Sequence, residues 1–143
     1  MIFPRLIKKA LLLKEERGWD HIAIAVDLHG TVFKSTYKPG LATEYYPYAK
    51  ECLQMLSDRP DILMYMYTGT PEDLRVEYFD FFNGDGIYMS PDQKGTMALM
   101  NIQNNEFQNF DDKPYFNVLL EDKAGFDPKI DWLDILIYLK TGM

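Results

Sequence analysis

Short apolar runs alternate along the chain with stretches whose apolar residues have the spacing of amphipathic helices. Strands are predicted over 22–26, 62–67, 87–89 and 115–120. Helices are predicted over 6–17, 44–57, 70–82, 95–105 and from 127 onward. Strands that alternate with helices favour right-handed βαβ units, with a parallel sheet between two helical layers. We therefore predict an α/β fold, a three-layer sandwich with a mostly parallel, Rossmann-like sheet.

The run from Ile22 to Val26 organises the rest of this pattern. Its five consecutive apolar residues are typical of a strand buried on both faces, and they run directly into Asp27. Gly30 allows a sharp turn soon afterwards. Asp27 is therefore expected at the carboxyl end of a central strand, where open α/β sheets bind their ligands.

Local signals set the expected helix boundaries. Residues 1–18 are predicted to form an N-terminal helical addition that ends at Gly18. Thr43 is a candidate cap for the helix over 44–57. Thr70, followed by Pro71 and two acidic residues, is a strong helix start.

Size and composition limit the classes of protein to consider. The 143 residues fit a single domain over 1–143, and a net charge of −7 argues against broad nucleic-acid binding, which depends on phosphate neutralisation. The only cysteine, Cys52, fits a reducing compartment, so a cytoplasmic location is expected. No apolar run is long enough for a membrane span, and the first residues do not resemble a signal peptide.

Polar residues follow three of the predicted strands. Asp27 ends the first, Thr68-Gly69-Thr70 the second, and Glu121-Asp122 the fourth. Each feature alone is a common helix cap or exposed turn, but parallel strands bring all three to one edge of the sheet. Carboxylates there would suit Mg²⁺ bridging to a phosphate, and the backbone N–H groups of Gly69 and Thr70 would suit the anion.

A lysine would complete charge neutralisation at such a site. Lys94 follows the third predicted strand on the expected edge, whereas Lys113 precedes the fourth strand at the opposite edge. Geometry favours Lys94, although either residue could be an ordinary exposed lysine.

Three stretches resemble motifs of the haloacid dehalogenase superfamily, whose members are mostly magnesium-dependent phosphatases. Val26-Asp27-Leu28-His29-Gly30-Thr31 resembles the nucleophile motif, an apolar strand followed by Asp-x-Asp-Gly-Thr. Residues 67–70 resemble the second motif, in which a strand ends in Thr or Ser. Residues 119–126 resemble the acidic metal-binding motif of small members of the superfamily. The first and last matches are fairly specific, and the second is weak by itself.

The resemblance implies a role for each matched residue. Asp27 would attack phosphorus, and Thr68 would bind phosphoryl oxygens of a phosphorylated substrate. Magnesium would be held by Asp27, the backbone carbonyl of His29 and Asp122, with Glu121 as a further contributor.

His29 departs from the motif, because most phosphatases of the superfamily have a second Asp there. Imidazole can also act as general acid and base. A catalytically silent member that keeps the phosphate and metal pocket is the alternative. A receiver-like signalling domain fits less well, since it needs an acidic pair after its first strand.

No stretch is long enough for a large cap domain. Residues 31–43 could instead form a short flap over the site, with Lys34, Tyr37 or Lys38 reaching the substrate. Capless relatives tend to take large substrates or to use a neighbouring subunit as cap, so a homo-oligomer stays open.

Overall fold

The strand that runs into Asp27 is the middle strand of the sheet. In this computed structural model, β1 (Ile22–Val26) pairs in parallel with β2 (Ile62–Met66) on one side and with β3 (Val118–Leu120) on the other. All five residues of β1 are buried, as its uninterrupted apolar sequence predicts. The structure describes residues 1–35, 40–103 and 114–142.

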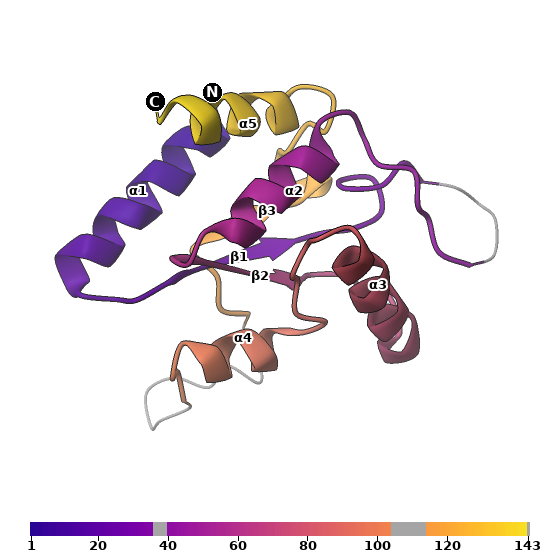
Figure 1. The fold of residues 1–143 in the computed structure, drawn as a ribbon, viewed down its shortest axis with the longest axis horizontal. Helices are drawn as coiled ribbons and strands as arrows, with labels where there is room; N and C mark the ends of the chain where they lie inside the picture. Colours follow the sequence, from indigo (N-terminus) through magenta and orange to yellow (C-terminus); the bar gives the residue numbers. More distant parts are fainter. Residues whose placement is uncertain (36–39, 104–113, 143) are drawn as a thin grey trace.

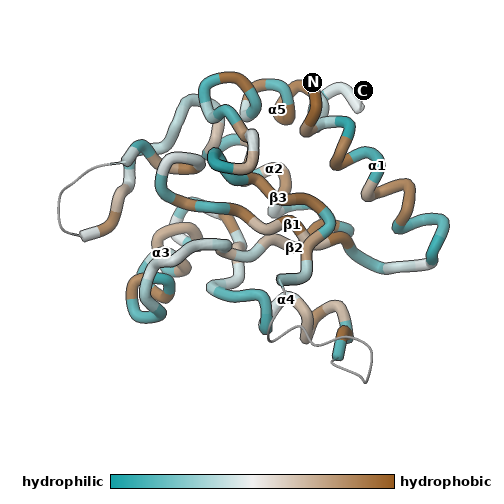
Figure 2. Tube along the Cα trace, turned by 180° about the vertical axis from the view of Figure 1, so that it is seen from behind, coloured by the Kyte–Doolittle hydropathy of each residue, from teal (hydrophilic) through white to brown (hydrophobic). Residues whose placement is uncertain are grey.

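Helices cover both faces of this small parallel sheet, so the chain has an α/β fold. Figure 1 shows α1 (Ile2–Arg17), α2 (Ala49–Asp58) and α5 (Asp131–Thr141) on one face. On the other face lies α4 (Gln93–Leu99), whereas α3 (Glu72–Gly84) lies beyond the carboxyl ends of the strands, and Figure 2 shows the same arrangement from behind. The predicted α/β sandwich is confirmed at this level. No helix in the described ranges is both long and apolar enough to cross a membrane.

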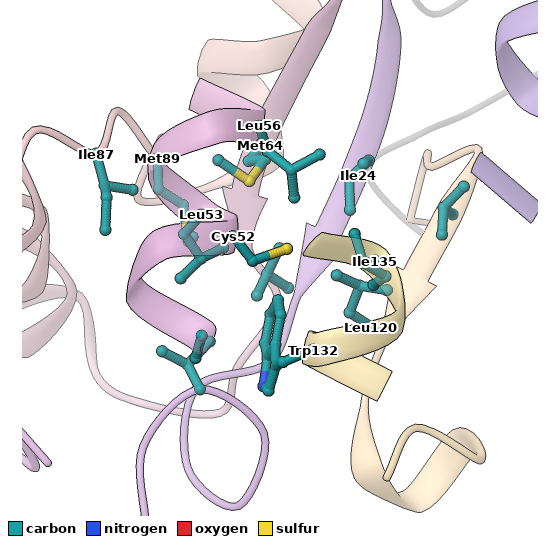
Figure 3. Close-up of a cluster of buried hydrophobic side chains, with 14 of the residues drawn as sticks. Ile24, Cys52, Leu53, Leu56, Met64, Ile87, Met89, Leu120, Trp132 and Ile135 are labelled. Atoms are coloured by element: carbon teal, nitrogen blue, oxygen red, sulfur yellow. The ribbon is translucent and has the colours of Figure 1, made fainter. Parts of the chain in front are cut away.

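The core between the sheet and α2 and α5 is built from side chains of all these elements (Figure 3). Cys52 is buried there among aliphatic residues, and burial raises the pKa of its thiol, as expected for an inert core residue. Trp132 is fully buried, and its indole N–H donates to the backbone oxygen of Thr31 at 2.8 Å. This bond ties α5 to the loop that follows β1.

The first helix begins earlier than predicted, at Ile2, and ends at Gly18, which has a φ of 69°. Pro4 is tolerated because it lies in the first turn, where N–H groups have no helical partner. Phe3 then packs edge-to-face on Phe126 with 5.0 Å between ring centroids. The segment 1–18 thus packs against the sheet and α5.

The prediction for the next helix is wrong at its start. α2 begins at Ala49, because the preceding residues pair with the loop after β1. Phe33 and Tyr45 form an antiparallel bridge, and the Lys34 N–H donates to the Glu44 oxygen at 2.9 Å. Thr43 therefore caps no helix.

The predicted strand at 87–89 is reduced to one parallel bridge between Ser90 and Tyr65. Other partners take the N–H groups that a strand would need. The Ile87 N–H donates to the Phe82 oxygen at 2.9 Å, and the Tyr88 N–H donates to Ser57 Oγ at 2.7 Å. The last strand is likewise shorter than predicted, although Asn117 still bonds the backbone of Ala23.

Three helix starts are also corrected. α3 begins at Glu72 with no side-chain cap, because the Thr70 hydroxyl bonds that of Thr68. α4 begins at Gln93 and is capped by Asp92, whose carboxylate accepts the Gly95 N–H. α5 begins at Asp131, after a turn in which Asp127 accepts the Lys129 N–H.

Candidate active site

The carboxyl edge of the sheet forms one wall of an open pocket of about 980 Å³. The register places this wall, since the Asp27 N–H bonds the Leu120 oxygen and the Tyr67 N–H bonds the Val26 oxygen. Seven of the predicted site residues line the pocket together, namely Asp27, His29, Thr68, Gly69, Thr70, Glu121 and Asp122.

The carboxylates of Asp27, Glu121 and Asp122 form the acidic site of the pocket, and the buried hydroxyl of Thr31 lies between Asp27 and Asp122. Its Oγ1 lies 3.3 Å from Asp27 Oδ2 and 3.4 Å from Asp122 Oδ1, and it accepts the Asp122 N–H at 3.0 Å. Thr31 comes four residues after Asp27, whereas Asp122 begins the 3₁₀ helix η1 (Asp122–Ala124) after β3. The hydroxyl has one proton, so it can donate to only one of the two carboxylates at a time.

The turn at Gly30 allows Asp122 to come this close. Gly30 has a φ of 82°, in the left-handed region that glycine adopts without strain. A Cβ added there would lie 2.9 Å from Asp122 Oδ2. The glycine therefore serves both the turn and the approach of the carboxylate.

The acidic site changes the ionisation of Asp27. Burial, together with the nearby charges of Glu121 and Asp122, raises the pKa of this carboxyl from 3.8 to about 6. Hydrogen bonds from the Leu28 N–H and the Thr31 hydroxyl oppose the shift but do not cancel it. Concentrated negative charge of this kind favours either a bound cation or a proton.

Asp27 and Asp122 supply carboxylate oxygens, which are the ligands that magnesium prefers. Among the residues that the structure describes, no group of three or more His, Cys, Asp or Glu side chains could hold a metal by itself. Magnesium in phosphate sites commonly takes only one or two carboxylates, and water and substrate oxygens complete the shell. The residues present therefore fit a magnesium ion shared with a substrate phosphate.

His29 projects from the turn after β1 and bonds a tyrosine of α3. Its Nε2 lies 2.8 Å from the hydroxyl of Tyr78, which also accepts the Ala42 N–H at 2.9 Å. Tyr78 is itself buried and stacks on Phe33 at 5.5 Å. Nε2 of His29 is thus bonded to a buried residue, and Nδ1 is the second ring nitrogen.

Thr68 and Thr70 form a hydroxyl pair just before α3. Their Oγ1 atoms are 3.0 Å apart, and the Thr70 N–H approaches Thr68 Oγ1 at 3.3 Å. The Thr68 hydroxyl proton can be donated to Thr70 or to a ligand in the pocket. Gly69 is exposed between them.

The structure does not bring the predicted lysine into the pocket. Lys94 is exposed on α4 and does not line the pocket, and Lys113 lies outside the described residues. Two cations that the sequence analysis did not single out line it instead, Arg75 of α3 and Lys123 of η1. Lys123 directly follows the Glu121-Asp122 pair, which was the available signal. Arg75 lies only five residues after Thr70, but nothing local pointed to it.

The proposed flap is described only in part. Lys34 pairs with Glu44 at 3.2 Å and does not line the pocket, whereas Ser35 does. Tyr37 and Lys38 lie outside the described residues.

Comparison with known proteins supports the fold. No protein-family model matches the chain, and no curated protein matches it. A solved structure described as a conserved protein from Bacteroides thetaiotaomicron superposes with a TM-score of 0.59. Its sequence is 23% identical, and the match covers 86% of this chain and 93% of that one. At this identity the match shows a shared fold.

Proposed function

We propose that this protein is a magnesium-dependent phosphohydrolase that acts through an aspartyl-phosphate on Asp27. The observation that carries the proposal is the convergence of Asp27, Thr68 and Asp122 on one pocket, with Thr31 in contact with both carboxylates. These residues lie in the stretches that resemble haloacid dehalogenase motifs, in the same order along the chain.

In the proposed reaction, an Asp27 oxygen attacks phosphorus, and the bond from phosphorus to the ester oxygen breaks. His29 gives the departing oxygen a proton. Because Nε2 is bonded to Tyr78, Nδ1 is the nitrogen left for this transfer. Water then attacks the aspartyl-phosphate, gives a proton back to His29, and releases inorganic phosphate and free Asp27.

The other polar groups would bind and orient the phosphoryl group. The Thr68 hydroxyl and the N–H groups of Gly69 and Thr70 are donors for its oxygens. Asp27 and Asp122 would hold magnesium, which when bound would neutralise charge on the phosphoryl oxygens. The raised pKa of Asp27 supports this assignment, because a cation would restore the charged carboxylate that the attack needs.

The test is turnover of para-nitrophenyl phosphate with and without magnesium. The wild-type protein should hydrolyse it only with the metal, and Asp27→Asn should reduce turnover to background. Asp80→Asn is the matched control, since Asp80 is an exposed carboxylate on α3 that does not line the pocket. Wild-type activity in Asp27→Asn would refute the covalent mechanism.

The two acidic residues after β3 allow a finer test of the metal. Asp122→Ala should weaken magnesium binding, and so raise the magnesium concentration needed for activity, more than Glu121→Ala does, because Asp122 contacts Thr31 and lies against the Gly30 turn. The reverse ranking would assign the ligand role to Glu121. Magnesium-dependent thermal stabilisation without turnover would favour a silent phosphate- and metal-binding module.

A further inference from the structure

The pocket is lined by residues outside the acidic site as well, and one of them carries a guanidinium. Arg75, from the first half of α3, lines the pocket together with Asp92 and Gln93. Its Nε atom is buried and has no hydrogen-bond partner among the described residues. Buried donors are nearly always satisfied in native proteins, so an unpaired one calls for an external acceptor.

The guanidinium of Arg75 is bonded to the protein through Nη1, which leaves the edge with Nε and Nη2 for a ligand. Nη1 approaches the Pro91 oxygen at 3.5 Å, and the side chain of Arg75 makes no other hydrogen bond in the part of the chain that the structure describes. The remaining edge carries the Nε–H and Nη2 donors side by side. Two parallel N–H donors at this spacing match the two oxygens of a carboxylate or phosphate.

The sheet register places this edge away from Asp27. The Met66 N–H bonds the Ser90 oxygen at 2.9 Å, and the Ser90 N–H bonds the Met64 oxygen at 3.0 Å, so Pro91 follows a residue that flanks β2. β1 lies on the other side of β2. With strands about 4.8 Å apart, the Pro91 position is two spacings, about 10 Å, from Asp27. A phosphoryl group attacked by Asp27 is therefore not the group that Arg75 would bind at Pro91.

We propose that Arg75 binds a second anionic group of the substrate, a phosphate or a carboxylate, while the reacting phosphoryl group lies at Asp27. This inference rests on the proposed function for the reacting end and names the substrate class, a phosphate ester with a second acidic group across the pocket. Asp92 lines the same pocket but makes no ion pair or hydrogen bond with Arg75 in the described part of the chain, and its Oδ1 caps α4 by accepting the Gly95 N–H at 3.2 Å. Lys123 lies with the acidic pair after β3, so it is assigned to the reacting end.

The experiment compares two probes that differ by one phosphate, fructose bisphosphate and fructose 6-phosphate. Affinities are measured by calorimetry with magnesium present, in Asp27→Asn protein so that neither probe is hydrolysed. In this parent the bisphosphate should bind at least about 10-fold more tightly. Arg75→Met should reduce the ratio to about one, and Arg75→Lys should give an intermediate ratio, because it keeps the charge but not the fork. Lys94→Met, an exposed cation outside the pocket, should keep the full preference.

Equal affinities in the parent, no binding of either probe, or a preference that survives in Arg75→Met would each overturn the proposal. If Arg75→Met fails to fold, Arg75→Lys and the NMR signal of the Arg75 Nε–H decide, since that signal should shift with the bisphosphate alone. The proposed function is judged separately, by turnover of para-nitrophenyl phosphate. Turnover without a bisphosphate preference would reject only the second anion site, and a preference without turnover would reject only the phosphohydrolase.

Discussion

The imidazole of His29 and the phenol of Tyr78 form a 2.8 Å hydrogen bond between residues 49 positions apart in the chain. The rings meet edge-to-face at 5.7 Å, and the phenol oxygen also accepts the backbone N–H of Ala42. A single buried hydroxyl thus holds both the turn after β1 and the segment that leads to α2. It connects His29 to the core of the protein.

Removal of this hydroxyl should affect both stability and chemistry. Tyr78→Phe keeps the ring stacked on Phe33 but leaves the buried Ala42 N–H without its acceptor. We expect a loss of roughly 1–3 kcal/mol in the free energy of unfolding. If His29 protonates the leaving group, turnover of alkyl phosphates should fall much more than turnover of para-nitrophenyl phosphate, whose leaving group needs little protonation.

Urea unfolding and the ratio of alkyl to aryl turnover measure these two effects. Tyr88→Phe is the matched control, because Tyr88 is 45% exposed on the surface. A destabilised Tyr78→Phe protein with an unchanged ratio would restrict Tyr78 to a structural role.

The raised pKa of Asp27 makes stability depend on pH in a defined direction. The folded protein binds a proton at Asp27 up to about pH 6, whereas the unfolded chain releases it near 3.8. Between these values the unfolded state loses its proton first, so stability falls as pH rises. The cost is absent below about pH 4 and complete above about pH 6. Because the group is partly exposed, solvent screening limits the cost to the order of 1 kcal/mol.

Asp27→Asn should remove this dependence. With a chelator present, the variant should match the wild-type melting temperature near pH 4 and exceed it near pH 8. Asp80→Asn, on the exposed side of α3, should show no such difference. Equal melting temperatures of Asp27→Asn and wild type at both pH values would show that the carboxyl is not destabilised by its surroundings.

The sequence predicted β1 and Asp27 well because their signal is local. Five consecutive apolar residues are typical of a strand buried on both faces, as in a parallel sheet, and a parallel sheet gathers the carboxyl ends of its strands at one edge. The same logic brought Thr68, Glu121 and Asp122 to the pocket, as the structure shows. In contrast, the run Ile87-Tyr88-Met89 has the same local character but forms no strand. The Ser57 hydroxyl, 31 residues away, takes the Tyr88 N–H, and no local pattern reveals such a competitor.

Arg75 and Lys123, the two cations that line the pocket, were not predicted from the sequence for a related reason. Lys94 follows the third apolar run, but α4 begins one residue before it and leaves it exposed away from the pocket. Arg75 lines the pocket from α3, and the position of that helix is set by tertiary packing. The Tyr78 contact with His29 depends on the same packing. The ends of strands can be predicted from the hydrophobic pattern and the length of an apolar run. The side chains that reach those ends from neighbouring helices cannot be predicted in this way.

The buried Thr31 hydroxyl should be needed for the arrangement of the two carboxylates. Thr31→Val keeps the volume but removes the contacts to Asp27 and Asp122 and the acceptor of the Asp122 N–H. We expect a loss of roughly 1–2 kcal/mol in unfolding free energy and a weaker affinity for magnesium. Thr31→Ser retains the hydroxyl and should keep the magnesium affinity close to that of wild type. Magnesium titration of both variants tests this, and equal affinities in Thr31→Val and wild type would exclude a role of the hydroxyl at the metal.

The last prediction concerns the cation that serves the reacting phosphoryl group. Lys123 lines the pocket directly after Asp122, whereas Lys94 is exposed outside it. A cation that stabilises charge developing in a transition state contributes a few kcal/mol, so its removal can slow the reaction by about 100-fold. Lys123→Ala should therefore lower kcat for para-nitrophenyl phosphate much more than Lys94→Ala. Because both lysines are exposed, neither substitution should change the melting temperature appreciably, and the loss of rate can be read as chemistry. A large loss in Lys94→Ala alone would mean that α4 moves toward the phosphoryl group when substrate binds, and the assignment of Lys123 would then be wrong.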